Sequence, residues 1–238
     1  METAEGIKIL TVDSSSFTGS VALCRGEFLV AESLLNVRST HSEKLLKQID
    51  LLLDEVGWSL QDLDLLAVVT GPGSFTGLRI GIATVKGLAQ VLNKPVVSVS
   101  ALQTAAMNLP LCSVPICAFL DARKKEVYSQ LFEWNPSDGP IAIGPSSVLP
   151  PEKLLKELPE KVAFVGDGVL LYRHLLDALP AQQALIPVAT AHQLRAAHAS
   201  WLALQAWQRG LGQSAAEILP TYIRPSDAEL NLSSKQGI

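Results

Sequence analysis

One pattern of elements occurs twice along this chain of 238 residues, and it limits the possible folds more than any other feature. In each half an apolar run ends in an aspartate, Asp13 or Asp121, and a second strand-like run follows closely. A helix comes next, and then an apolar strand that runs straight into glycine, at Gly71 or Gly166. Strands that alternate with helices are typical of α/β folds. The pattern therefore predicts two related lobes, each with a mixed sheet and flanking helices, and a cleft between them.

Hydrophobic periodicity, together with the positions of proline and glycine, predicts the individual elements. We expect strands at 7–12, 20–24, 27–34, 65–70, 96–99, 114–120, 126–134 and 162–165. We expect helices at 41–56, 76–92, 101–108, 151–158, 169–179 and 190–210. Residues 1–104 are expected to form the N-terminal lobe and 105–238 the C-terminal lobe, with the long helix near 190–210 packing back onto the N-terminal lobe. The polar tail after Pro225 is expected to fray.

Composition narrows the class of protein. The chain has 19 Lys and Arg against 23 Asp and Glu, a formal net charge of −4, so any role with RNA is expected to run through a partner. Cys24, Cys112 and Cys117 form no Cys-x-x-Cys pair, which argues against a disulfide framework and a cysteine zinc site. No apolar run reaches the roughly 20 residues that cross a membrane, and the acidic start does not resemble a signal peptide. We therefore expect a cytoplasmic protein.

The first candidate ligand site is the turn Asp13-Ser14-Ser15. A carboxylate at the end of a strand, followed by a turn rich in hydroxyls, can hold phosphate through backbone N–H groups and hydroxyls. The aspartate could also hold a magnesium ion through water. A turn closed by a local hydrogen bond of the aspartate is the alternative.

The second half offers matching candidates. Asp121 is followed by Arg123, which could reach a phosphate or a partner's carboxylate, or simply lie at a solvated hairpin rim. Gly166 and Gly168 stand between a strand and a helix, where the absence of a side chain would let a nucleoside approach the backbone. They could equally be an ordinary connection between strand and helix.

The glycine-rich segment 71–81 is the strongest local signal in the sequence. It lacks the lysine of a Walker loop, its third glycine falls one residue late for a dinucleotide fingerprint, and no Gly-x-Ser-x-Gly elbow occurs. Gly77 and Gly81 lie four residues apart and therefore on one face of the expected helix. Because glycine inside a helix costs about 1 kcal/mol relative to alanine, we expect something to press close to this face. That neighbour is either another subunit or an internal element.

The histidines argue against a metalloenzyme. None of His41, His174, His192 and His198 has a second histidine three or four residues away, so the chain has no His-x-x-x-His metal pair. No nucleophile and base are recognisable as a set either. The sequence therefore predicts no metal site and no catalytic residues.

Taken together, several segments resemble the TsaB (YeaZ) family. The matching motifs are 9–15, 40–46, the highly specific glycine-rich segment 71–81, 121–123 and the C-terminal Pro-Thr-Tyr-Ile-Arg at 220–224. These matches span nearly the whole chain.

The resemblance implies an actin/hexokinase/Hsp70 (ASKHA) fold and a role in making N6-threonylcarbamoyladenosine at position 37 of tRNA. It implies a non-catalytic subunit that pairs with the catalytic TsaD, joins the ATPase TsaE, meets tRNA only through the complex and self-associates when alone. The chain itself is expected to need no cofactor, and the resemblance leaves room for ATP or ADP in the complex. The helix at 75–87, helped by 41–53, is the expected partner interface, with contacts from His41, Leu45, Leu46, Phe75, Thr76, Gly77, Arg79, Ile80, Gly81 and Thr84.

Two alternatives remain open at this point. A small-metabolite kinase of the same fold would need a carboxylate in the cleft, and Asp13 and Asp121 are the candidates. A peptidase-like protein would need a nucleophile with a base, or a metal. Under the subunit hypothesis, a bulky charge at Gly77 is expected to break pairing without unfolding the monomer.

Overall fold

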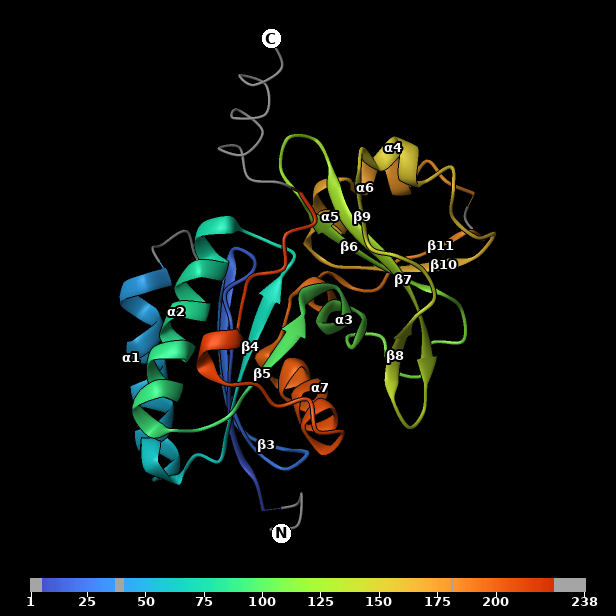
Figure 1. Cartoon of the computed structure of the whole chain (residues 1–238). Coiled ribbons are helices and arrows are strands. Elements are labelled where there is room, and N and C mark those ends of the chain that lie inside the picture. Colours follow the sequence, from blue (N-terminus) through green and yellow to red (C-terminus); the bar gives the residue numbers. More distant parts are fainter. Residues whose placement is uncertain (1–5, 37–40, 181, 225–238) are drawn as a thin grey trace.

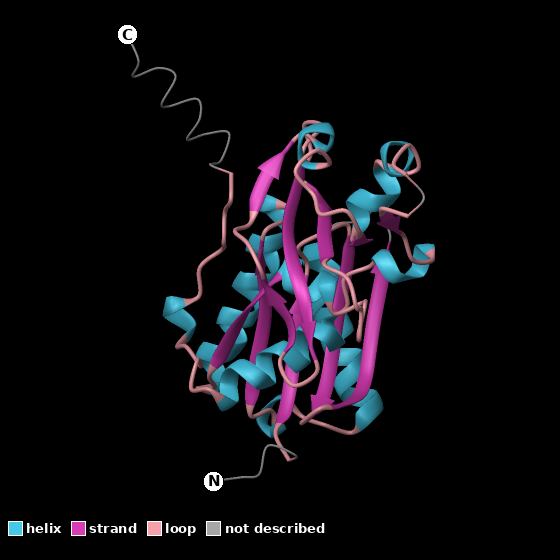
Figure 2. Cartoon of the chain, turned by 90° about the vertical axis from the view of Figure 1, so that its right-hand side faces the viewer, coloured by secondary structure: helices cyan, strands magenta, loops and turns pink. Residues whose placement is uncertain are grey.

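The computed structural model describes residues 6–36, 41–180 and 182–224, and it contains two mixed β-sheets with helices around them (Figure 1). The predicted α/β class with two sheets is confirmed. Viewed from the side of the second sheet, helices lie behind its strands (Figure 2).

The first sheet has the strand order β3-β2-β1-β4-β5. Strands β1, β2 and β3 pair antiparallel, and β4 and β5 continue the sheet parallel to β1. All seven residues of β4 are buried, which is typical of a central parallel strand. The strands are β1 (Lys8–Asp13), β2 (Thr18–Arg25), β3 (Phe28–Asn36), β4 (Leu65–Gly71) and β5 (Val96–Ser100).

Two helices cover each face of this sheet. Helices α1 (His41–Val56) and α2 (Phe75–Leu92) cover the outer face (Figure 1). Helix α7 (Ala196–Gln208) contacts β1, β2 and β5 on the inner face. Helix α3 (Ala101–Ala106) contacts β4 and β5 as well as β6 and β7, so it lies between the two sheets. The last quarter of the chain thus completes the core of the first sheet.

The second sheet has the order β11-β10-β6-β7-β8, and β9 pairs with β7. Its strands are β6 (Ile116–Asp121), β7 (Val127–Asn135), β8 (Gly139–Ala142), β9 (Ser147–Leu149), β10 (Val162–Val165) and β11 (Ala184–Leu185). The short helices α4 (Pro151–Leu154), α5 (Asp167–Leu171) and α6 (Arg173–Leu176) accompany it.

Several elements differ from the predictions. Strands β8, β9 and β11 were not predicted because they are two to four residues long. The helix expected at 169–179 is divided into α5 and α6 at Tyr172, whose φ of −106° and ψ of 24° are not helical. The helix expected at 190–210 begins only at Ala196, after a 3₁₀ turn at Ala189–His192.

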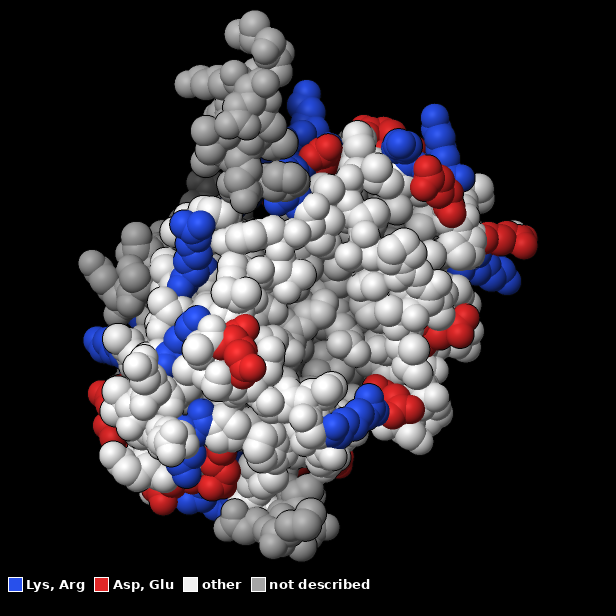
Figure 3. All heavy atoms as spheres, viewed as in Figure 1, with Lys and Arg blue, Asp and Glu red and all other residues white. Residues whose placement is uncertain are grey.

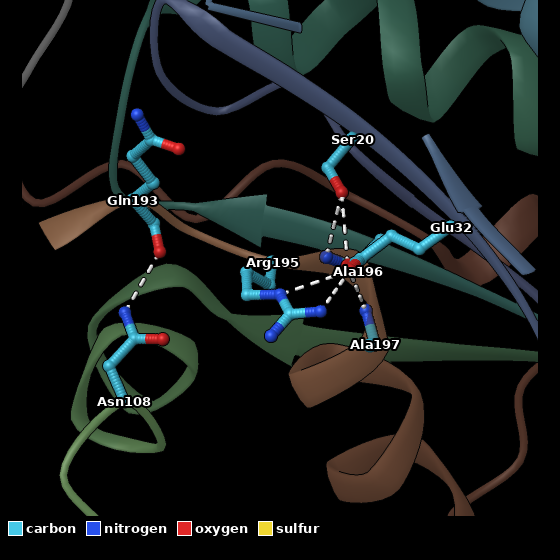
Figure 4. Close-up of polar contacts among 7 residues, drawn as sticks. All are labelled: Ser20, Glu32, Asn108, Gln193, Arg195, Ala196 and Ala197. Carbon is cyan, nitrogen blue, oxygen red and sulfur yellow. Dashed lines mark hydrogen bonds and ion pairs between the residues drawn. The ribbon is translucent and has the colours of Figure 1, made fainter. Parts of the chain in front are cut away.

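The late start of α7 has a visible cause at Glu32 of β3 (Figure 4). The Glu32 carboxylate accepts hydrogen bonds from the Arg195 guanidinium, at 3.0 Å from its Nε, and from the Ala197 backbone N at 3.0 Å. The Ala196 backbone N donates to the Ser20 hydroxyl at 3.0 Å. Glu32 therefore caps the N-terminus of α7, although the two lie far apart in the sequence. Negative charge is favoured at the N-terminus of a helix.

Residues 213–224 form a segment that we call the C-terminal strap, coloured red in Figure 1. Gln213 pairs with Val96 of β5, and the Thr221 backbone N donates to the Thr70 carbonyl at 2.8 Å. Farther along, the Arg224 guanidinium donates to the Ala122 carbonyl at 3.0 Å, in the hairpin between β6 and β7. The strap therefore crosses from the first sheet to the second. The tail predicted to fray after Pro225 lies outside the described residues.

Candidate functional site

The turn after β1 uses its own aspartate to hold itself together. The Asp13 Oδ1 atom accepts the Ser15 backbone N–H at 2.8 Å and the Ser15 hydroxyl at 2.7 Å. The other oxygen, Oδ2, is buried and has no hydrogen-bond partner in the described part of the chain. Of the two interpretations of this turn, the local hydrogen bond of the aspartate is the one observed.

The glycine-rich segment packs directly onto that turn. The Ser14 hydroxyl donates to the Gly77 carbonyl at 2.8 Å, and the Ser74 backbone N donates to the Ser15 carbonyl at 2.6 Å. A Cβ atom at Gly77 would lie 2.1 Å from the Ser14 carbonyl oxygen, and one at Gly81 would lie 2.2 Å from the Ser14 hydroxyl oxygen. Internal packing therefore explains both glycines, and their prediction as partner contacts is wrong, because both are buried against Ser14.

The turns of the second half of the chain lie opposite the Asp13 turn and the glycine-rich segment. The Asp121 Oδ1 atom accepts the Arg123 backbone N–H at 2.8 Å, and the Arg123 Nε atom is 3.6 Å from Asp121 Oδ2. The Asp167 carboxylate accepts the Asp121 backbone N–H at 3.0 Å. Gly166 and Gly168 are buried, and a Cβ atom on either would lie within 2.8 Å of the Phe119 carbonyl oxygen. These two glycines therefore allow α5 to approach β6 closely, and their part in nucleotide binding stays a prediction.

The cleft between the two sets of turns is nearly filled. Its walls come from both halves of the chain: Ser15, Ser16, Phe17, Pro72, Gly73, Ser74, Leu120, Asp121, Arg123 and Asp167. The cavity measures about 20 Å³, which is room for about one water molecule. A nucleoside phosphate would enter only if the loop at 71–74 moved away from Ser15. Phosphate binding by Asp13, Ser14, Ser15, Asp121 and Arg123 stays a prediction.

Burial controls the electrostatics of this cleft. Desolvation raises the pKa of Asp13 from 3.8 to about 6, against the two hydrogen bonds from Ser15, and the nearby Asp167 adds to the rise. Burial is also the main cause that raises the pKa of Asp167, with a smaller contribution from Asp121. Asp167 was missing from the predicted site residues, although it stands between the two predicted glycines. Its position directly after a buried strand was the available signal.

The raised pKa of Asp13 predicts a pH-dependent stability. A folded-state pKa above the unfolded value means that the folded protein holds the proton more tightly, so stability falls as pH rises from about 4 to about 6. Asp13→Asn has no charge to bury, so its stability relative to the wild type is expected to rise by about 2 kcal/mol between pH 4 and pH 7. Urea unfolding of both proteins across this range measures the difference. A constant difference at all pH values would contradict the assignment.

The predicted partner face is distributed over α1 and α2. Leu45 is only 3% exposed and packs in the core of the first sheet, so its prediction as a partner contact is wrong. Leu46 is 56% exposed on the other side of α1. On α2, Phe75, Thr76 and Arg79 are exposed, and Ile80 and Thr84 are half-buried. His41 begins α1, but its side chain lies outside the described part of the chain.

A hollow runs between α1 and α2 on the outer surface. It measures about 360 Å³, and its walls are mostly aliphatic: Leu46, Lys47, Ile49, Asp50, Leu53, Leu60 and Leu88. Val91, farther along α2, is 85% exposed. Sequence reasoning missed Leu88 and Val91. Both residues are apolar but lie outside the buried stripe of α2, and this pattern in the sequence could have indicated an exposed apolar surface.

In the described ranges, no group of three or more His, Cys, Asp or Glu side chains is placed to hold a metal ion. Within the same ranges, no helix has both the length and the apolar character of a membrane span.

Comparison with known proteins gives consistent matches over most of the chain. The family model described as "TsaD: tRNA N6-adenosine threonylcarbamoyltransferase" matches residues 35–232. The chain is 29% identical to the "tRNA threonylcarbamoyladenosine biosynthesis protein TsaB" of Bacillus subtilis, with 93% of this chain and 96% of that protein covered. It is 31% identical to the protein of the same name from Haemophilus influenzae, with 92% and 94% covered. The solved structure "YeaZ from Pseudomonas aeruginosa" matches with a TM-score of 0.79 at 30% identity, covering 91% of this chain and 99% of that chain.

Proposed function

Because this chain belongs to the TsaB (YeaZ) family and has its actin-like ASKHA fold, we propose that it is the non-catalytic partner of a TsaD-type subunit. The pair would transfer threonylcarbamoyl groups to adenosine 37 of tRNA, and the TsaD-type subunit would supply the chemistry. A TsaE-type ATPase would join the complex in the cytoplasm. Without its partner, the chain would self-associate through the face formed by α1 and α2.

The observation that carries the proposal is the apolar hollow between α1 and α2. The hollow is lined mostly by leucines, and Leu46 in its wall is 56% exposed. An exposed apolar surface of this kind typically marks an interface with another protein. Leu46 and Leu88 belong to the outer layer of helices, so a partner can reach them without disturbing the sheet behind (Figure 1).

The state of the cleft supports the non-catalytic part of the proposal. The carboxylate of Asp13, which a kinase of this fold would need, accepts two hydrogen bonds from Ser15 of its own turn and is fully buried. The cavity beside it holds about one water molecule. The sequence also lacks a His-x-x-x-His pair, which is the metal motif expected of the catalytic paralogue.

A charge in the hollow is the direct test. Leu46→Asp is expected to weaken association with the TsaD-type subunit by about tenfold or more, since burying a leucine contributes about 1.5–3 kcal/mol. The stability of the isolated chain should change by less than about 1 kcal/mol, because Leu46 is mostly exposed. Co-purification, followed by an assay of tRNA modification, measures both steps.

Val188→Asp is the matched control, because Val188 is 73% exposed and lies in the C-terminal half of the chain. It should leave association and modification unchanged. If Leu46→Asp associates as the wild type does, the hollow is not the interface. Threonylcarbamoyl transfer by this chain alone would contradict the non-catalytic role.

A further inference from the structure

We propose that this chain contacts RNA directly within the complex, through a surface at the mouth of the cleft that binds a single-stranded loop. We call this surface the aromatic–arginine rim, and it consists of Phe17, Phe75, Arg79, Arg123 and Tyr222. The inference rests on the proposed function only for the identity of the RNA. It adds a contact that the net charge of −4 does not predict.

The first half of the rim is a stack of three side chains. The rings of Phe75 and Tyr222 lie 5.1 Å apart with an interplanar angle of 26°. The Arg79 guanidinium lies over the Phe75 ring at 3.8 Å, and its Nε donates to the Tyr222 hydroxyl at 3.3 Å. The two rings remain 38% and 39% exposed. The first turns of α2 and the C-terminal strap therefore hold a preformed planar surface that faces solvent.

The second half of the rim repeats this arrangement with residues from the turns beside β1 and β6. The Arg123 guanidinium lies over the Phe17 ring at 4.3 Å, and Phe17 is 48% exposed. Asp121 positions Arg123 from below by accepting its backbone N–H. Both halves thus combine an aromatic ring with an arginine plane.

The two halves are continuous. Phe17, Arg123 and Ser74 line the same cavity, and Phe75 follows Ser74 directly in the chain. Two residues after Tyr222, Arg224 donates to the Ala122 carbonyl, next to Arg123. The rim therefore crosses from one sheet to the other above the cleft.

The hairpin behind Arg123 adds positive charge in an uncommon conformation. Arg123, Lys124 and Lys125 are exposed, and their φ angles are 60°, 53° and 61°, a region that residues other than glycine rarely adopt. Three such residues in succession are a structural outlier, and outliers of this kind concentrate at functional sites. In Figure 3, Lys and Arg side chains stand over this hairpin and over the first turns of α2.

This combination fits a single-stranded nucleic acid. Unpaired bases stack on aromatic rings and on guanidinium planes, and the neighbouring phosphates pair with exposed Lys and Arg. The Arg79 and Arg123 guanidinium groups each lie over one ring, and both residues are exposed, so a base is expected to stack against them. Paired bases in a helix are not available for such stacking, so a loop is the expected ligand.

The test uses the complex with the TsaD-type subunit and an RNA hairpin whose loop has the sequence of an anticodon loop. Phe17→Leu keeps an apolar side chain but removes the ring, and it is expected to weaken hairpin binding about tenfold. Phe28→Leu is the matched control, because Phe28 is 73% exposed on β3 and away from the rim. Fluorescence anisotropy measures both affinities, and a fully paired duplex of equal length should show no effect of Phe17→Leu.

A second variant reports on charge. Lys125→Gln should reduce the slope of log K against log salt concentration by roughly 0.7, the value for one contact to a single strand. Lys161→Gln should not, because Lys161 directly precedes β10 and so lies at the opposite end of the second sheet from the hairpin. Size-exclusion chromatography checks that each complex still assembles. Unchanged hairpin affinity in an intact Phe17→Leu complex overturns the proposal. Loss of assembly instead would identify the rim as a protein interface and also overturn it. Failure of the wild-type chain to pair with the catalytic subunit would contradict the proposed function alone.

Discussion

Gly77→Ala is expected to lower the free energy of unfolding by about 3 kcal/mol, because the added Cβ atom would lie 2.1 Å from the Ser14 carbonyl oxygen. That oxygen belongs to the backbone of a buried turn, so it cannot rotate away as a flexible side chain would. Either α2 or the turn after β1 must shift, and the hydrogen bond from the Ser14 hydroxyl to Gly77 would be strained. Urea unfolding monitored by circular dichroism measures the loss.

Gly87→Ala is the matched control in the same helix. No atom lies within 4 Å of a Cβ at Gly87, so this alanine should instead stabilise the protein by about 0.5–1 kcal/mol through its helix propensity. Equal effects at the two positions would show that the packing of Gly77 is not the cause. The expectation that a bulky charge at Gly77 breaks pairing without unfolding the monomer stays a prediction, and the crowding of a Cβ at Gly77 by the Ser14 carbonyl oxygen argues against it.

Glu32→Ala is expected to destabilise the protein by about 3 kcal/mol. The substitution removes the acceptor for the Ala197 backbone N–H and leaves the Arg195 guanidinium without its carboxylate. The side chain of Glu32 is only 9% exposed, so water replaces these bonds poorly. Thermal unfolding measures the effect, and Glu32→Gln should recover part of it, because an amide oxygen still accepts one of the bonds.

Asp177→Ala provides the comparison for an ion pair at the surface. Asp177 pairs with Arg173 at 2.7 Å, but both side chains are at least half exposed. Its loss should cost less than about 0.5 kcal/mol. If Glu32→Ala were equally mild, the N-terminus of α7 would not depend on this carboxylate.

Elements with a local hydrophobic pattern were predictable from the sequence. Elements whose bounds depend on contacts with distant parts of the chain were not. Helix α1 and strand β10 were predicted with their observed bounds, because an amphipathic stripe and a buried apolar run are local signals. Strand β8 contains Pro140, pairs with the end of β7 and accepts a hydrogen bond from Gln103 of α3, so it depends on contacts that no local pattern shows. The start of α7 depends on Glu32, 165 positions from Ala197, and no local pattern encodes that contact.

The candidate site shows the same division. The aspartates at the ends of β1 and β6 were identified from the repeated pattern. Asp121 lines the cleft with Asp167, and Asp13 is buried near enough to Asp167 for the two carboxylates to interact. The role of the glycines was left open, because choosing between a subunit and an internal neighbour needed the position of Ser14. That residue contacts Gly77 across 63 positions of sequence. The prediction of Leu45 as a contact failed for a simpler reason, since one residue along a helix changes the side that faces the core.

The position of α7 bears on the order in which the protein takes shape during synthesis. Ser20 and Ala196 meet in the folded chain although they are 176 residues apart, and α7 covers the inner face of strands made at the beginning. While the ribosome is still translating the middle of the message, α7 has not been made and cannot cover that apolar face. The first sheet is therefore expected to reach its native state only after α7 has left the exit tunnel, and until then the nascent chain depends on chaperones for protection.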